Sequence, residues 1–297
     1  AQPDLVAAPL LYSLGLTEKP VLFYVSPDAP NIVSHLNRRA IPAFATPESC
    51  AAALAALSPR SRLQSGVIPD LPEVDCSDLS PGALNEAEAK ALFARFGVPV
   101  TREVVAQTPE AAAAVARGFS APVVVKILSS EILHKSEVGG VALNIRPEVV
   151  AETCRAMLDR VRASTSARVD GFLVQEMVQG AVEMILGFNR DPQLGAYVLL
   201  GAGGVTTELY KDVAIRLLPL TRDSARSMID ELTCGALLKG FRGRPLADVE
   251  ALVDAILAFA GMVRVLGDQL LEAEINPVFV LPQGQGVRAG DSLVVLG

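Results

Sequence analysis

Residues 122–141 read PVVVKILSSEILHKSEVGGV and carry the clearest sign of the fold in this chain. They open with an apolar run, Pro122–Leu128, which is typical of a buried β-strand. Lys126 interrupts that run, and a lysine buried without a partner is energetically expensive. Its ammonium group therefore either reaches solvent at the edge of a sheet, where it discourages aggregation, or meets an anion. The strand by itself favours neither interpretation.

The loop after this strand, Ile132–Val141, combines two glycines with two basic side chains. Paired glycines such as Gly139 and Gly140 let backbone amides approach a phosphate closely, while His134 and Lys135 add one titratable and one fixed cation. A strand lysine followed by such a loop predicts a cradle for a triphosphate. The loop does not match a Walker A sequence, so it does not imply the P-loop fold.

Two acidic side chains lie where one expected strand ends and the next begins. Glu176 belongs to the stretch Gln175–Val178, where a carboxylate and exposed backbone can grip a ribose and an adenine edge. The alternative is a surface glutamate at a hairpin. Glu183 has the same two interpretations, and because it alternates with Val182 and Met184 we expect it to face away from them.

A candidate metal site lies near the C-terminus. Asn276 follows the acidic segment Glu272–Glu274, and Asp291 comes later in the same region. An Asn carbonyl and an Asp carboxylate are hard oxygen ligands that suit a magnesium ion held between protein and phosphates. The alternative is the solvated end of an acidic strand.

The spacing of apolar, proline and capping residues divides the chain. Expected strands at Pro20–Ser26 and Ile41–Phe44, followed by an alanine-rich helix from Thr46, indicate part of a parallel α/β sheet. Residues 59–83 are rich in proline and lack periodicity, as a linker does. Beyond them, mixed strands and helices indicate an α+β domain with more than one sheet. Helices are expected there from Asn85, from Thr108 and over Pro147–Arg162, Ser224–Leu232 and Asp248–Leu266, and strands over Val98–Val105, Pro122–Leu128, Gly171–Val178, Ala181–Phe188, Tyr197–Leu200, Leu271–Leu281 and Ser292–Leu296.

Composition restricts the class of protein. The 297 residues are 51% hydrophobic, enough for two or three domains with cores of their own. A net charge of −7 argues against a nucleic-acid partner, because binding to a phosphate backbone needs a basic face. The apolar runs are too short for a membrane span, and we expect no signal peptide. Four scattered cysteines fit a reducing cytoplasm better than a zinc site or a disulfide framework.

Taken together and in this order, the motifs resemble the ADP-forming acetate–CoA ligase family, also called NDP-forming acyl-CoA synthetases, and its ATP-grasp domain. The resemblance spans about Leu84 to the C-terminus. The first segment, with Ala40-Ile41-Pro42 and TPESCAAALAAL, is similar to the tail of the family's succinyl-CoA-synthetase-like CoA-ligase domain. The stretches that carry the resemblance are PVVVKILSSEILHKSEVGGV, VQEMVQGAVEMILGFNRDPQLG, LLGAGGVTTELYKDVAIRLLPL, LLKGFRGRP and EAEINPVFV.

The resemblance implies a fold and a set of domains. The fold is an ATP-grasp domain of two subdomains, preceded by a partial flavodoxin-like parallel α/β segment. Residues 1–58 would be the tail of the CoA-ligase domain, 59–83 a linker and 84–297 the ATP-grasp domain.

The resemblance also implies roles for individual residues. Lys126 would contact the ATP phosphates, with Leu133, His134 and Lys135 closing over them. Asn276 and Asp291 would bind magnesium. Ribose and adenine would be held by Glu176 and Val178, and Glu183 is a further candidate for nucleotide binding. Two acids depart mildly from the family pattern, which more often has Asp at the positions of Glu137 and Glu274.

In this family the histidine at the position of His134 takes part in a phosphate relay. The chemistry is sound, because a neutral imidazole can attack a γ-phosphate and form a phosphoramidate that passes the phosphate onward. The alternative is that His134 only hydrogen-bonds ATP. The family places a first phosphohistidine in its CoA-ligase domain, so we expect this chain to bind nucleotide without completing acyl-CoA synthesis by itself.

The partners implied by the resemblance are coenzyme A, a small carboxylic acid, and the remaining CoA-binding domains, either in the same protein or as a separate alpha-type subunit. An oligomer is also expected. A second hypothesis is an inactive ligand-sensing module of a protein acetyltransferase fusion. A third is a carboxylate–amine ligase, which would share the ATP-grasp fold without needing the HKSEVGGV loop.

Overall fold

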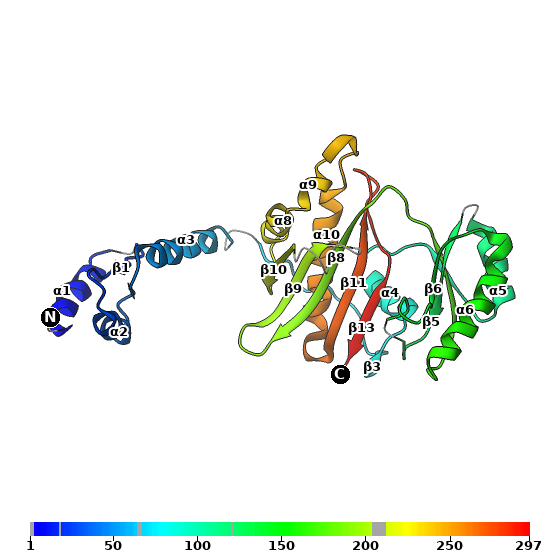
Figure 1. The fold of residues 1–297 in the computed structure, drawn as a ribbon, viewed down its shortest axis with the longest axis horizontal. Coiled ribbons are helices and arrows are strands. Elements are labelled where there is room, and N and C mark those ends of the chain that lie inside the picture. The colour runs from blue at the N-terminus through cyan, green and yellow to red at the C-terminus, as the bar shows by residue number, and fades with distance from the viewer. Residues whose placement is uncertain (1–2, 18, 64–66, 120–121, 133, 204–211) are drawn as a thin grey trace. The chain divides into compact units, whose positions relative to one another are not determined.

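A computed structural model describes residues 3–17, 19–63, 67–119, 122–132, 134–203 and 212–297 (Figure 1). The chain divides into two compact units, Ala1–Gly66 and Val67–Gly297. Among these described residues, no helix is both long and apolar enough to cross a membrane. The four cysteines are all free thiols.

The first unit is a small α/β segment. Strands β1 (Phe23–Tyr24) and β2 (Ala43–Phe44) pair in parallel, as expected. They are connected through helix α2 (Pro30–Arg38), and the side chains of Leu36 and Ile41 are fully buried in the small core. Helices α1 (Pro3–Leu14) and α3 (Pro47–Leu63) lie before and after this motif.

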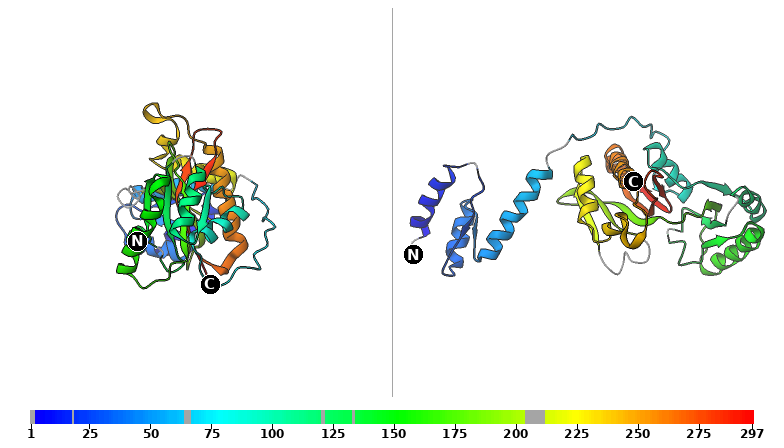
Figure 2. Two further views of the ribbon diagram at one scale, coloured as in Figure 1. Left: turned by 90° about the vertical axis from the view of Figure 1, so that its right-hand side faces the viewer. Right: turned by 90° about the horizontal axis from the view of Figure 1, so that it is seen from above.

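The second unit contains two antiparallel sheets, which confirms the prediction of more than one sheet. The smaller sheet has the strand order β4–β7–β5–β6, and helices α5 and α6 pack against its strands (Figures 1 and 2). The elements are β4 (Glu103–Ala106), α5 (Pro109–Ala116), β5 (Val123–Leu128), β6 (Val141–Ile145), α6 (Val150–Ser164) and β7 (Gly171–Glu176).

The larger sheet has the strand order β10–β9–β8–β11–β13–β3, with β12 paired to β11. Helix α8 contacts β10, α10 contacts β11 and α4 contacts β13. The elements are β3 (Gly82–Ala83), α4 (Glu86–Arg95), β8 (Val182–Asp191), β9 (Gly195–Ala202), β10 (Val213–Leu217), α8 (Arg222–Glu231), α9 (Gly235–Leu238), α10 (Val249–Leu266), β11 (Leu270–Val280), β12 (Val287–Ala289) and β13 (Ser292–Leu296).

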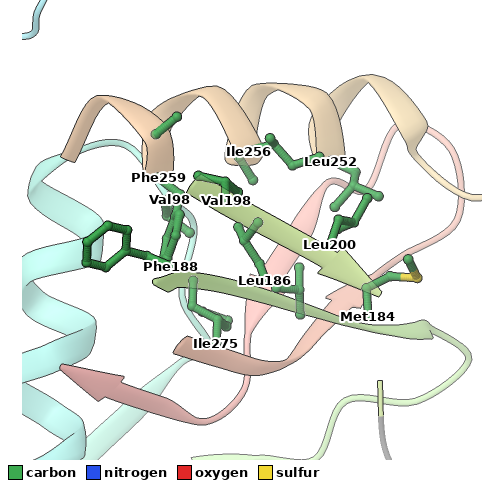
Figure 3. Close-up of a cluster of buried hydrophobic side chains, with 14 of the residues drawn as sticks. Val98, Met184, Leu186, Phe188, Val198, Leu200, Leu252, Ile256, Phe259 and Ile275 are labelled. Carbon is green, nitrogen blue, oxygen red and sulfur yellow. The ribbon is translucent and has the colours of Figure 1, made fainter. Parts of the chain in front are cut away.

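One hydrophobic core of the second unit lies between the larger sheet and its helices, and a second lies between the smaller sheet and helices α5 and α6. Alternate residues of β8 and β9, such as Leu186 and Leu200, point toward Ile256 and Phe259 of α10 (Figure 3). The ring of Phe259 lies 5.8 Å from that of Phe93 on α4, measured between centroids. This packing fixes α4 beside α10, and α4 supplies charged side chains to the site described below.

Helix α4 begins where its capping residues predict. Asn85 Oδ1 accepts a hydrogen bond from Glu88 N at 3.1 Å, and Glu88 Oε2 accepts one from Asn85 N at 2.9 Å. This reciprocal capping box satisfies two of the backbone donors that the first turn leaves open, and it sets the position of Glu86 in that turn.

The segment expected to be a linker is partly structured. Helix α3 ends at Leu63 and β3 spans Gly82–Ala83, both inside the range 59–83. Between them, Val74, Cys76 and Leu79 pack against the core of the second unit. Apolar side chains in the proline-rich stretch thus anchor its second half by hydrophobic burial.

Candidate functional site

Two adjoining cavities lie in the second unit. One, of about 370 Å³, is lined by residues from both sheets. The other, of about 340 Å³, is lined by the loop between β5 and β6 and by residues from the C-terminal strands. The two cavities share Ser136, Asn276 and Asp291.

Most of the site residues inferred from the sequence line one of these cavities. His134 and Lys135 line the smaller one together with Asn276 and Asp291. Leu133 lies outside the described residues. The larger cavity collects Lys126, Glu176, Val178, Glu183, Asn276 and Asp291.

Lys126 occupies an interior strand, so the interpretation of an edge-strand lysine is wrong. Strand β5 is flanked by β7 on one side and β6 on the other, and the Lys126 side chain is only 6% exposed. Its ammonium meets two strong acceptors, Glu86 Oε1 at 2.6 Å and Gly290 O at 2.8 Å. Asp291 Oδ2 lies 3.5 Å away. Anionic partners thus compensate the burial of this lysine.

Glu86 and Lys90, both on α4, belong to the same cluster and were not among the predicted site residues. Lys90 Nζ lies 2.9 Å from Glu86 Oε1 and 2.6 Å from Glu103 Oε2. In sequence, Glu86 and Lys90 look like an ordinary i,i+4 surface pair. A usable signal is present, because both lie on the same helical face as the buried Ala89 and Phe93.

Lys135 closes the cluster on the side of the smaller cavity. Its ammonium lies 3.1 Å from Glu86 Oε2 and 3.1 Å from Asp291 Oδ1. Burial lowers the pKa of Lys135, but Glu86 and Asp291 outweigh it and the pKa is raised overall. For Glu86, burial raises the pKa, yet Lys126, Lys90 and Lys135 together hold it well below the ordinary glutamate value. Both groups are therefore charged at neutral pH.

The backbone amides of Gly139 and Gly140, which were predicted to approach a phosphate, take part in hydrogen bonds within their own loop. Gly140 N donates to Lys135 O at 2.7 Å, and Gly139 N donates to Ser136 O at 3.2 Å. Both amides therefore donate to carbonyl groups within the loop itself. A Cβ atom on Gly140 would lie 2.9 Å from Lys135 O, so a glycine is needed there for close backbone approach.

Glu176 lies at a crossing between the sheets, and the hairpin alternative is wrong. Strand β7 belongs to the smaller sheet and β8 to the larger one, so the segment after Glu176 passes from one to the other. Glu176 Oε1 accepts a hydrogen bond from Arg102 N at 2.8 Å. Glu183, near the start of β8, is exposed while Val182 and Met184 are buried, which confirms its predicted facing.

His134 is exposed at the smaller cavity, whose lining also includes Glu274. Burial raises the pKa of the Glu274 carboxyl, and the negative charges of Glu272 and Asp291 add to this. A hydrogen bond from Asn276 and the nearby His134 act in the opposite direction. The partly buried carboxyl of Glu274 therefore lines the same cavity as the imidazole of His134. In the sequence, Glu274 was notable only as a departure from the family motif.

The two candidate magnesium ligands are adjacent. Asn276 N donates to Asp291 O at 3.1 Å, which brings the two side chains to the boundary shared by both cavities. Within the described ranges, no group of three His, Cys, Asp or Glu side chains is arranged to hold a metal by itself. Two oxygen ligands fit magnesium, which commonly takes one or two protein ligands and completes its shell with water and phosphate oxygens.

Comparison with known proteins identifies the family of the second unit. The family model described as an ATP-grasp domain matches residues 75–296. The chain is 37% identical over 216 residues to the beta subunit of ADP-forming acetate–CoA ligase II from Pyrococcus furiosus, covering 72% of this chain and 92% of that subunit. A trans-feruloyl-CoA synthase from an unidentified prokaryote is 33% identical over 95% of this chain, which spans 41% of that protein.

A solved relative shows the same fold. It is an acetyl-coenzyme A synthetase from Candidatus Korarchaeum cryptofilum in complex with coenzyme A and Mg-AMPPCP, its phosphohistidine segment pointing towards the nucleotide-binding site. Its TM-score with this chain is 0.61, at 38% identity, over 72% of this chain and 93% of that one.

Proposed function

This chain belongs to the ATP-grasp family of ADP-forming acetate–CoA ligases, and on that premise we propose that it is the ATP-binding, phosphate-relay portion of an ADP-forming acyl-CoA synthetase. The overall reaction would convert a carboxylic acid, coenzyme A and ATP into acyl-CoA, ADP and phosphate. In relatives, the ATP-grasp part occurs as a separate beta subunit or within a longer chain.

One observation carries the proposal. The cavity that contains His134 shares Asn276 and Asp291 with the cavity that contains Lys126. A nucleotide with its base beside Glu176 and Val178 would direct its phosphates past Lys126 toward His134. The candidate nucleophile, cations and metal ligands would then surround one end of a triphosphate, which is the arrangement that phosphoryl transfer requires.

The chemistry assigned to these residues is transfer of the γ-phosphoryl group to His134. The lone pair of a neutral imidazole nitrogen forms the N–P bond while the P–O bond to the β-phosphate breaks, and ADP leaves with that electron pair. Lys126 and Lys135 would stabilise charge on the transferred oxygens. Asn276 and Asp291 would hold magnesium, which supplies further charge neutralisation.

The remaining steps require partners. We assign coenzyme A and acid binding to CoA-binding domains, in the same protein or in an alpha-type subunit, that exchange phosphate with His134. Residues 1–58 would be the tail of such a domain, 59–83 a linker and 84–297 the ATP-grasp domain. The feruloyl-CoA synthase match, which extends over 95% of the chain, supports including the first segment. We place the enzyme in the cytoplasm, where its four free thiols would stay reduced.

The test is transfer of label from γ-³²P-ATP to the full chain in the presence of magnesium. A phosphohistidine is labile to acid and stable to base, so we expect a label with those properties that is lost in His134→Ala. The chain has two histidines, so His35→Ala is the matched control and should retain the label. A label that survives in His134→Ala would refute the relay. Nucleotide binding without any label would favour a ligand-sensing role.

A further inference from the structure

A buried carboxylate stands behind the two lysines of the proposed phosphate site. The Glu86 side chain is fully buried, and its two oxygens lie 2.6 Å from Lys126 Nζ and 3.1 Å from Lys135 Nζ. Lys126 lines the larger cavity and Lys135 the smaller one, whereas Glu86 is not among the described residues that line either.

From this arrangement we propose that Glu86 is a positioning residue, which keeps the ammonium groups of Lys126 and Lys135 charged and aimed at the triphosphate. The inference rests on the proposed function, because it assumes that these two lysines receive phosphates. Glu86 itself would touch neither nucleotide nor metal, and would act only through the lysines.

The reason is electrostatic. Lys90, Lys126 and Lys135 converge on this carboxylate, with Lys90 2.9 Å from Glu86 Oε1. Three ammonium groups so close together, on side chains that are at most 8% exposed, repel one another strongly unless a negative charge lies among them. Lys90 has a second partner in Glu103, at 2.6 Å. Among the described residues, Lys126 and Lys135 have one carboxylate partner in common besides Glu86, which is Asp291.

Asp291 cannot replace Glu86 in this role once the site is loaded. Its side chain is 31% exposed and lies at the boundary of the two cavities, where the proposed function gives it to magnesium. Glu86, held at 0% exposure by the first turn of α4, keeps its place whether or not the cavities are filled. A preorganised counter-charge of this kind spares the lysines a rearrangement when phosphates arrive.

The experiment compares Glu86→Gln with Glu103→Gln in the full chain. Both substitutions preserve side-chain shape and remove one buried or largely buried negative charge, but Glu103 pairs with Lys90 instead of the two cavity lysines. The dissociation constant of Mg-ATP would be measured by isothermal titration calorimetry. That of adenosine, which lacks phosphates, would be measured by its displacement of a fluorescent ADP analogue.

We expect Glu86→Gln to weaken Mg-ATP binding by about tenfold or more, since two charge-assisted contacts lose their alignment. Adenosine binding should change by less than about twofold, and Glu103→Gln should leave the Mg-ATP constant within about threefold of the wild type. Equal losses for Mg-ATP and adenosine, or wild-type binding of Mg-ATP by Glu86→Gln, would overturn the proposal.

A second variant keeps the test decisive if Glu86→Gln does not fold. Glu86→Asp retains the charge but withdraws it by one C–C bond, about 1.5 Å. It should raise the ratio of the Mg-ATP dissociation constant to the adenosine dissociation constant by at least about threefold, and an unchanged ratio contradicts the inference. Wild-type chain that fails to bind Mg-ATP would instead refute the proposed function, so the two failures are distinguishable.

Discussion

Replacing Lys126 by methionine tests whether this side chain serves both the fold and the nucleotide. Methionine has similar length and packs well among apolar residues, but it cannot donate to Glu86 Oε1 or Gly290 O, the acceptors now at 2.6 and 2.8 Å. Each lost bond to or from a charged group costs about 1.5–3 kcal/mol. Because Glu86 keeps Lys90 and Lys135 as partners, we take the lower end for both bonds and expect a loss of about 3 kcal/mol in unfolding free energy.

The same substitution should weaken the binding of Mg-ATP by roughly thirtyfold, or about 2 kcal/mol, because the Lys126 ammonium group no longer contacts the phosphates. Ligand binding stabilises the folded chain by RT ln(1 + [L]/Kd). At a concentration of Mg-ATP equal to about 100 times the wild-type Kd, the wild type therefore gains about 2.7 kcal/mol and the variant less than about 1 kcal/mol.

The assay is urea denaturation followed by far-ultraviolet circular dichroism, with and without Mg-ATP, since the chain has no tryptophan to report by fluorescence. Lys239→Met is the matched control, because Lys239 is 65% exposed and pairs with Asp230 at the surface. The Lys239→Met substitution should change the free energy of unfolding by less than about 1 kcal/mol. A Lys126→Met chain that matches the wild type in stability, or gains as much from Mg-ATP, would refute the reasoning.

Two further substitutions test the loop and the buried carboxylate. Gly140→Ala places a Cβ atom 2.9 Å from Lys135 O. We therefore expect labelling of His134 to slow by about tenfold and the free energy of unfolding to fall by about 1–3 kcal/mol. Gly118→Ala is the control, because the Cβ position of Gly118 faces open space, and it should behave as the wild type in both assays. The pKa of Glu86 is held below its usual 4.5, so as pH falls the unfolded chain takes up this proton first. The stability contributed by Glu86 is thus complete above pH 4.5 and declines below it, and urea midpoints measured from about pH 5 to pH 3 should fall more steeply for the wild type than for Glu86→Gln. Equal slopes would contradict this account.

Local patterns were sufficient for many elements of the fold. Helix α4 and its capping box followed from Asn85 and Glu88, and α5 from Thr108, whose hydroxyl accepts from Ala111 N at 3.1 Å. Strand β10 was not predicted, because at the edge of the larger sheet its Val213, Ile215 and Leu217 face outward and no polar alternation marks it. Periodicity reports burial, and an exposed apolar edge strand does not display it.

For the candidate site, the sequence by itself determined the chemistry of the individual groups. Each group alone left a structural alternative open, and it was the motifs around Lys126, His134 and Asn276 taken together that resembled a nucleotide-binding family. The tertiary structure decided which groups meet. Lys126 lies on an interior strand, and the amides of Gly139 and Gly140 donate to carbonyls within the loop. Glu86 of α4 contacts both Lys126 and Lys135. The physical reason is that ion pairs between residues far apart in sequence depend on how the sheets and α4 pack, and no local pattern encodes those distances.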